Sequence, residues 1–194
     1  METETKETIP LWLAVAITVC VALPFGIWVT NINKDLVNIP IWASFIVWAE
    51  YFALGAKPAA LKTIVPAFII GVVAAAIIMT AYALLIAPLG NDPALFVSCF
   101  VGFCIAIYAM KYIPVIQVGS LPFFNGISML LAIYFVGAFP QTLFTTNTNL
   151  FPAVAALWAI LAGLLGAFLG WFNVTITFPH PVKKTEVTHQ PVGV

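Results

Sequence analysis

The chain has 194 residues, of which 63% are hydrophobic and only 7% are charged, and its mean hydropathy is +1.10. A soluble domain carries roughly 25% charged residues, so this composition excludes an ordinary water-soluble fold. The formal net charge is zero, and all seven basic residues are lysines. We therefore expect an all-α protein that crosses a membrane several times and has the lipid bilayer as its surroundings.

Six apolar stretches follow one another along the chain, each about 17 to 24 residues long. At 1.5 Å rise per residue, helices of this length match a hydrocarbon core of about 30 Å. The stretches are 11–30, 39–55, 64–87, 93–112, 120–139 and 151–173. They predict a short cytoplasmic N-terminal segment (1–10), a six-helix transmembrane domain (11–175) and a disordered cytoplasmic tail (176–194).

The lysines indicate which way the helices cross. If the six helices alternate, one side of the membrane holds six lysines and the other side holds only Lys34. The six are Lys6, Lys57, Lys62, Lys111, Lys183 and Lys184. Short cytoplasmic loops carry an excess of Lys and Arg, so this distribution predicts that both termini are cytoplasmic.

The second and third stretches resemble the fourth and fifth in the same orientation. Pro40 precedes the segment 66–71, which begins with Pro and contains Phe68, and Pro93 precedes the similar segment 122–126. Repeated helical units occur in channels and transporters, where the binding site often lies between the repeats. The pattern predicts a weak parallel hairpin repeat.

Glu50 is the one acidic residue that lies inside a predicted span, near the cytoplasmic end of the second helix and next to Tyr51. An ionisable group in lipid is costly and usually faces the bundle interior or a water-filled cavity. In one interpretation, Glu50 reaches the membrane surface and pairs loosely with Lys57 or Lys62. In the other, Glu50 and Tyr51 line a cytoplasmic vestibule.

Asn125 is a second candidate, one turn into the fifth helix, and Ser128 follows three residues later on the same face. These side chains either hydrogen-bond a small polar solute or bond a neighbouring helix, a contact worth about 0.6 kcal/mol on average. Ser98 in the fourth helix is a further polar candidate. Phe123 and Phe124 either narrow a pore or pack as core and lipid-facing aromatics.

The sixth helix carries small residues at four-residue spacing from 155 to 167, which include Gly163, and a Gly-x-x-x-Gly pair at Gly166 and Gly170. Small side chains permit close contact between membrane helices. This face therefore either packs within the chain or forms the seam of a homo-oligomer.

The residue types needed for catalysis are sparse. Both histidines, His180 and His189, lie in the polar tail, and the three cysteines lie in apolar stretches without metal-ligand spacing. The sequence also lacks a glycine-rich phosphate loop and a pair of membrane carboxylates. We expect no catalytic residues, no metal, no cofactor and no nucleic-acid partner, so the protein is not expected to be an enzyme.

Several short aromatic motifs carry a resemblance to a known family. They are Trp42-Ala43-Ser44-Phe45, Tyr51-Phe52-Ala53, the Phe68 to Gly71 segment, Phe100-Val101-Gly102-Phe103 and Pro122-Phe123-Phe124-Asn125-Gly126. Together they resemble the bacterial inner-membrane proteins of the domain of unknown function family 1097. The resemblance implies a multi-pass protein of the inner membrane, and it supplies no catalytic or binding residues.

Two functional classes follow from these observations. The first is a channel or facilitator for a small neutral solute or weak acid, because the spans lack the charged groups of an ion-coupled pump. Its path would include Glu50, Asn125, Ser128 and Ser98, with Phe123 or Phe124 as a constriction. The second class is a non-transporting accessory subunit whose last helix docks on a larger membrane complex.

Overall fold

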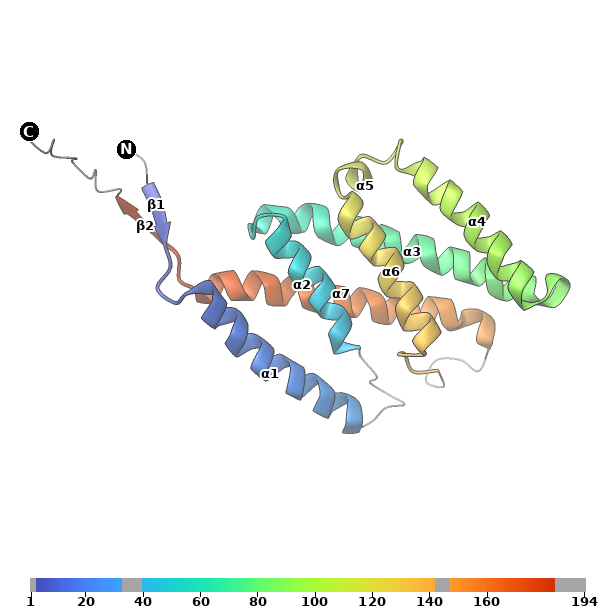
Figure 1. The fold of residues 1–194 in the computed structure, drawn as a ribbon, viewed down its shortest axis with the longest axis horizontal. Helices are drawn as coiled ribbons and strands as arrows, with labels where there is room; N and C mark the ends of the chain where they lie inside the picture. The colour runs from blue at the N-terminus through green and yellow to red at the C-terminus, as the bar shows by residue number, and fades with distance from the viewer. Residues whose placement is uncertain (1–2, 33–39, 142–146, 184–194) are drawn as a thin grey trace, which may run out of the picture.

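A computed structural model describes residues 3–32, 40–141 and 147–183, and these residues are mostly helical (Figure 1). Two short strands lie near the ends of the chain. In chain order the elements are β1 (Thr3–Lys6), α1 (Leu11–Ile32), α2 (Ile41–Ala53), α3 (Pro58–Leu89), α4 (Asn91–Ala109), α5 (Pro114–Val118), α6 (Ser120–Val136), the 3-10 helix η1 (Thr148–Leu150), α7 (Phe151–Ile176) and β2 (His180–Lys183).

Four described helical segments are long and apolar enough to cross a membrane. They are Leu11–Val29, Pro58–Leu89, Asn91–Ala109 and Thr148–Ile176. The other two predicted spans, 39–55 and 120–139, form the shorter apolar helices α2 and α6. With 13 residues, α2 is only about 20 Å long. Its end is followed by Gly55 at φ 93°, and α6 ends at Gly137 at φ 71°, because glycine readily adopts the left-handed backbone that stops a helix.

The helix α3 is longer than the predicted stretch 64–87, since it begins at Pro58 and runs for 32 residues. Pro58 occupies the first turn, where its missing N–H costs no intrahelical hydrogen bond. In contrast, α4 ends at Ala109, three residues before the predicted end, because Pro114 begins the separate short helix α5 and disfavours helical backbone just before it.

The core is built on two close helix crossings. Where α3 crosses α6, a Cβ on Gly71 would overlap the Phe123 carbonyl, and a Cβ on Gly126 would overlap the Phe68 carbonyl. Where α2 crosses α7, a Cβ on Gly166 would overlap the Ser44 carbonyl. Only glycine permits backbones to approach this closely.

The three glycines of the predicted small-residue face all lie inside the chain's own bundle. Gly163 lies against the Phe68 ring, Gly166 against the α2 backbone, and a Cβ on Gly170 would lie 2.9 Å from the Tyr51 Cβ. This face is therefore filled by α2 and α3 of the same chain and is not available as the seam of a homo-oligomer.

The helix contacts do not reproduce the predicted parallel repeat. Gly71 and Gly126 make reciprocal contacts where α3 crosses α6. Beyond this crossing the two hairpins differ, because α2 packs mainly on α7 whereas α4 packs on α3. The surroundings of α2 are thus set by α7, which belongs to neither hairpin, whereas α4 contacts α3 alone among the described elements.

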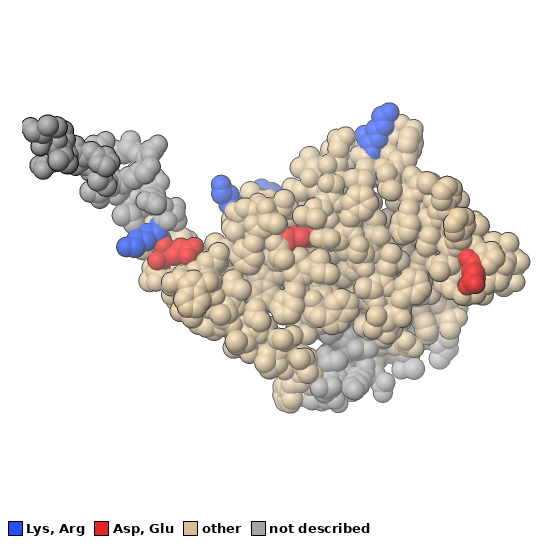
Figure 2. Space-filling model, in the orientation of Figure 1, with Lys and Arg blue, Asp and Glu red and all other residues tan. Residues whose placement is uncertain are grey.

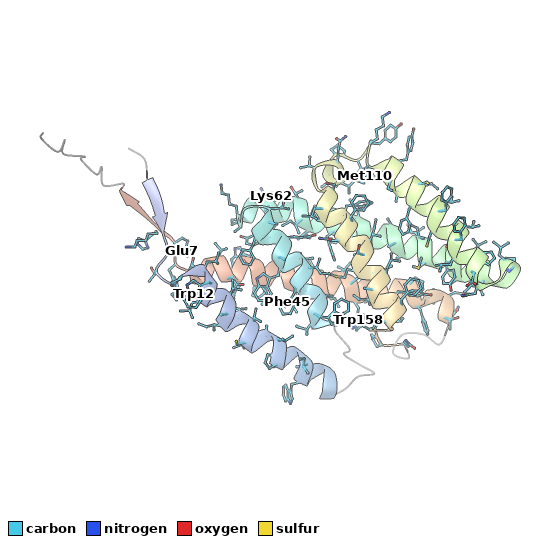
Figure 3. The ribbon with its side chains drawn as sticks, viewed as in Figure 1. Glu7, Trp12, Phe45, Lys62, Met110 and Trp158 are labelled. Atoms are coloured by element: carbon cyan, nitrogen blue, oxygen red, sulfur yellow. The ribbon has the colours of Figure 1, made fainter. Side chains whose placement is uncertain are left out.

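The lysines with described side chains lie along one edge of the molecule, the upper edge in Figure 2. They are Lys6, Lys57, Lys62 and Lys111. Figure 3 shows Lys62 beside the turn between α2 and α3, and Met110 after α4 on the same upper side. The predicted Lys34 and Lys184 lie outside the described residues.

The two strands form a ribbon that joins the ends of the chain. β1 and β2 pair antiparallel, with Thr3 opposite Lys183 and Lys6 opposite His180. Beside the ribbon, the Thr177 carbonyl accepts hydrogen bonds from the backbone N–H groups of Thr8 and Ile9 at 2.9 and 3.2 Å. The predicted disorder of the tail 176–194 therefore does not describe its first residues, because backbone pairing with β1 orders them. Residues 184–194 lie outside the described part.

Candidate functional site

Glu50 lies on the buried side of α2, near the C-terminal end of this short helix. Its side chain is only 3% exposed. The residues of α2 buried with it are Ala43, Ser44, Val47, Trp48 and Tyr51. Because α7 and α6 both pack on α2, a carboxylate on this side lies inside the bundle rather than at the membrane surface.

The partner of Glu50 is Asn125. The Asn125 Nδ2 group, on α6, donates a hydrogen bond to Glu50 Oε1 on α2. Lys57 and Lys62, the alternative partners considered from the sequence, are both exposed. The structure thus brings together two residues that were predicted separately, and we name the contact surface around this pair, between α2 and α6, the α2/α6 seam.

Three buried polar atoms of α2 have no hydrogen-bond partner among the described residues. They are Glu50 Oε2, Trp48 Nε1 and the Tyr51 hydroxyl. Buried polar groups in proteins are nearly always paired, and each group left unpaired needs an explanation. A carboxylate oxygen accepts hydrogen bonds, an indole N–H donates one, and a phenol does both. The Glu50 carboxyl group faces α6, where Asn125 lies. Tyr51 instead packs against Gly170 of α7, so these groups point to different neighbours of α2.

The remaining predicted site residues do not all gather at the seam. Phe123 is 1% exposed and packs in the core, where its carbonyl meets Gly71. Phe124, 43% exposed, and Ser128, also exposed, lie on the outside of α6. Ser98 is buried on α4, and its hydroxyl donates to the Leu95 carbonyl of its own helix at 3.1 Å. The structure therefore does not bring Ser98, Phe124 and Ser128 together with Glu50.

One polar contact was missed by the sequence reasoning. Asn173 Nδ2, on α7, donates to Thr18 Oγ1 at 2.6 Å and to the Ala14 carbonyl at 3.2 Å, both on α1. Asn173 is fully buried, and its Oδ1 atom has no described partner. The signal was available, because Asn173 follows Gly170 by three residues and so shares its helix face.

The surface grooves are apolar. One lies along α4 by Phe96 and Phe100, one between α3 and α4, and one between α3 and α7 by Ile77 and Leu157. Glu50 and Asn125 line none of these three grooves. Within the described ranges, no three His, Cys, Asp or Glu side chains lie close enough together to hold a metal ion.

Comparison with known proteins gives one match. The family model described as "Protein of unknown function (DUF1097)" matches residues 11–177, which include every helix from α1 to α7. No curated protein and no solved structure matches the chain. With its apolar helices and a match over most of its length, the chain is a membrane protein that belongs to the DUF1097 family.

Proposed function

We propose that the protein is a facilitator that lets a small neutral solute or weak acid cross the membrane passively, along the α2/α6 seam. The observation that carries this proposal is the buried Glu50 carboxyl group, which has one oxygen bonded to Asn125 and the other without a described partner. An ionisable group inside a membrane bundle is costly and typically marks a functional position.

The seam chemistry favours a solute that donates hydrogen bonds. Glu50 Oε2 is an acceptor while the carboxyl group is ionised, and the neutral amide of Asn125 leaves its charge without a cationic partner. Small amides, and weak acids in their neutral form, carry the matching N–H or O–H donors.

We propose that the chain lies in the inner membrane and crosses it six times. Both termini then lie in the cytoplasm. Support comes from the described lysines, which all lie along one edge of the molecule (Figure 2). An excess of Lys in short loops on one side marks that side as cytoplasmic. Glu50 and Asn125 then lie toward the cytoplasmic side of the bundle.

The accessory-subunit alternative loses the feature that suggested it, because α2 and α3 of the same chain cover Gly163, Gly166 and Gly170. A homo-oligomer remains part of our proposal, through the exposed outer sides of α1 and α4. The rings of Phe96 and Phe100 on α4 are 62 to 70% exposed and stack with their centroids 6.0 Å apart.

The test is stopped-flow light scattering on proteoliposomes that contain the full chain. Urea, acetamide, glycerol, ammonia and acetic acid are compared with empty vesicles, for the wild type, Glu50→Gln and Asn125→Leu. We expect rapid flux of at least one solute that donates hydrogen bonds, slowed at least about tenfold by Glu50→Gln, which corresponds to about 1.4 kcal/mol.

Ser128→Ala is the matched control, because Ser128 lies on the same helix as Asn125 but on its exposed side. Its flux should equal that of the wild type. Wild-type flux no faster than that of empty vesicles for every solute, over a range of pH, would refute the facilitator.

A further inference from the structure

The six apolar helices form two sets of three that make most of the same contacts in opposite directions, with the contact of α1 with α2 as the exception. α3 packs on α6 as α7 packs on α2, and α4 packs on α3 as α1 packs on α7. In Figure 1, α1 and α4 run in opposite directions, as do α2 and α6, and α3 and α7. A half-turn in the plane of that view brings α1, α2 and α3 to the places of α4, α6 and α7.

The buried faces of α2 and α6 correspond residue by residue. The buried residues of α2 are Ala43, Ser44, Val47, Trp48, Glu50 and Tyr51. Moving each of them 79 positions along the chain, as from Ser44 to Phe123, gives six of the seven buried residues of α6. These are Pro122, Phe123, Gly126, Ile127, Met129 and Leu130. The two helices therefore present the same face to the core.

The helices α3 and α7 correspond with a shift of 95 positions, as from Gly71 to Gly166. With this shift, eight of the nine buried residues of α3 correspond to buried residues. Seven of these lie in α7, and the eighth, Thr177, follows its last residue. The backbone contacts follow the same rule. A Cβ on Gly71 would meet the Phe123 carbonyl and the Ile127 nitrogen, and one on Gly166 would meet the Ser44 carbonyl and the Trp48 nitrogen.

The outer helices α1 and α4 correspond with a shift of 80 positions. Ala14 and Ala94 are both fully buried. One turn later, Thr18 and Ser98 are both buried hydroxyls that donate to carbonyls of their own helix, at 2.9 and 3.1 Å. The correspondence therefore covers all six helices, in burial and in contacts.

Opposite running directions make this an inverted repeat rather than the parallel repeat expected from the sequence. In the six-crossing arrangement proposed above, the axis that relates its halves lies in the membrane plane. Inverted repeats in transporters place the solute site between the repeats and alternate its access by moving one repeat against the other. The half-turn exchanges α3 with α7 and α2 with α6, so the contacts within these two pairs lie on the axis that relates the two repeats. They are α3 with α7, where the Phe68 ring meets Gly163, and α2 with α6, the seam that holds Glu50.

The two ends of the seam differ in chemistry. By the shift that relates α2 to α6, the counterpart of Glu50 is Met129 and the counterpart of Asn125 is Ile46. A hydrogen bond thus closes the end beside the lysines, and two apolar side chains occupy the matching place at the other end. Both ends are covered here, since Glu50 is 3% and Met129 0% exposed.

We propose that the two inverted repeats exchange conformations, so that the seam opens in turn at its Glu50–Asn125 end and at its Ile46–Met129 end. The hydrogen bond from Asn125 to Glu50 is the latch of the cytoplasmic end, and a solute that donates hydrogen bonds to Glu50 competes with Asn125 for the carboxylate. This deepens the facilitator proposed above and rests on it for the solute, but its test uses no solute.

The test is double electron–electron resonance on the full chain in lipid nanodiscs, with Cys20, Cys99 and Cys104 replaced by alanine. One pair of spin labels, at positions 54 and 121, reports the cytoplasmic end, and the other, at positions 42 and 136, reports the outer end. All four native residues are at least 41% exposed, so labels there do not disturb the core. We expect two distances for each pair, with opposite populations at the two ends.

Asn125→Leu removes the latch and should raise the ratio of open to closed forms at the cytoplasmic end at least about fivefold, because the buried Glu50 carboxylate then lacks its hydrogen bond in the closed form, while the outer end closes. Glu50→Gln keeps an acceptor for Asn125 and should leave the populations nearly unchanged. Ser128→Ala is the control for substitution on α6.

A single label-to-label distance for both pairs in every variant would overturn the proposed exchange. An increase of the distance at both ends in the same variant would overturn it as well. Circular dichroism and gel filtration of each variant identify a misfolded sample. If Asn125→Leu is misfolded, Glu50→Leu removes the same hydrogen bond from the α2 side. Opposite populations without any solute flux would support the exchange and leave the facilitator refuted, so the two failures are distinguishable.

Discussion

Asn173 near the end of α7 donates a hydrogen bond to Thr18 on α1, 155 residues earlier in the chain, at 2.6 Å. The same amide group donates to the Ala14 carbonyl, and Thr18 is itself bonded to that carbonyl. Only a few α1 residues are buried, so this contact carries much of the attachment of the first helix to the last.

Thr18→Val should therefore destabilise the protein more than Asn173→Leu. Thr18→Val leaves the fully buried Asn173 amide with one acceptor fewer, whereas Asn173→Leu removes the polar group and leaves Thr18 bonded to its own helix. We expect about 0.6 to 1.7 kcal/mol for the coupling, measured as a double-mutant cycle of unfolding in detergent. Additive effects of the two substitutions would contradict this reading of the contact.

Asn125→Leu should cost about 1 to 3 kcal/mol of stability, because it leaves the buried Glu50 carboxylate without its described hydrogen bond. Adding Glu50→Leu to Asn125→Leu should restore most of the loss, since the charge is then gone. Thermal unfolding followed by gel filtration measures both variants. A double variant less stable than Asn125→Leu alone would show that Glu50 is stabilised by something other than Asn125.

Gly166→Ala should destabilise the α2–α7 crossing by about 1 to 3 kcal/mol, because the added Cβ overlaps the backbone of Ser44 and neither helix can yield by a side-chain rotation. Leu164→Ala, on an exposed position of the same helix, is the control and should change the melting temperature little. Equal melting temperatures for Gly166→Ala and the wild type would contradict the close crossing.

The proposed six crossings predict which side of the membrane each turn faces. A cysteine placed at Lys111 or Lys57 should react with an impermeant maleimide only from the cytoplasmic side, and one placed at the exposed Leu89 only from the outside. The test uses the chain with Cys20, Cys99 and Cys104 replaced, in right-side-out and inside-out vesicles. Labelling of positions 57 and 89 from the same side would exclude the six-crossing arrangement.

The sequence predicted where the helices lie along the chain, but it did not predict which side of each helix is buried. The six apolar stretches correspond to α1, α2, α3, α4, α6 and α7. Phe124 and Ser128 were candidates for an interior path, with packing or lipid contact as the alternative, and they lie on the outside of α6. A helix that is apolar all round gives little sign of which side faces lipid and which faces other helices, so hydropathy could not decide this.

The pairing of Glu50 with Asn125 could also not be predicted from the sequence, because the two residues are 75 positions apart and their contact depends on how α2 and α6 meet. The inverted repeat was hidden for a related reason. What corresponds between its halves is burial and contact, while the side chains differ, as with Tyr51 and Leu130. Comparison of residue types along the chain suggested a parallel repeat because Pro and Phe begin both α3 and α6 segments.

The ribbon of β1 and β2 bears on the number of times that the chain crosses the membrane. Backbone pairing of Thr3 with Lys183 holds the two ends of the described chain together. A path that leaves one side of a surface and returns to it crosses that surface an even number of times. An arrangement with five crossings would separate β1 from β2, so the ribbon fits the six crossings proposed above and would be lost if a single helix failed to span.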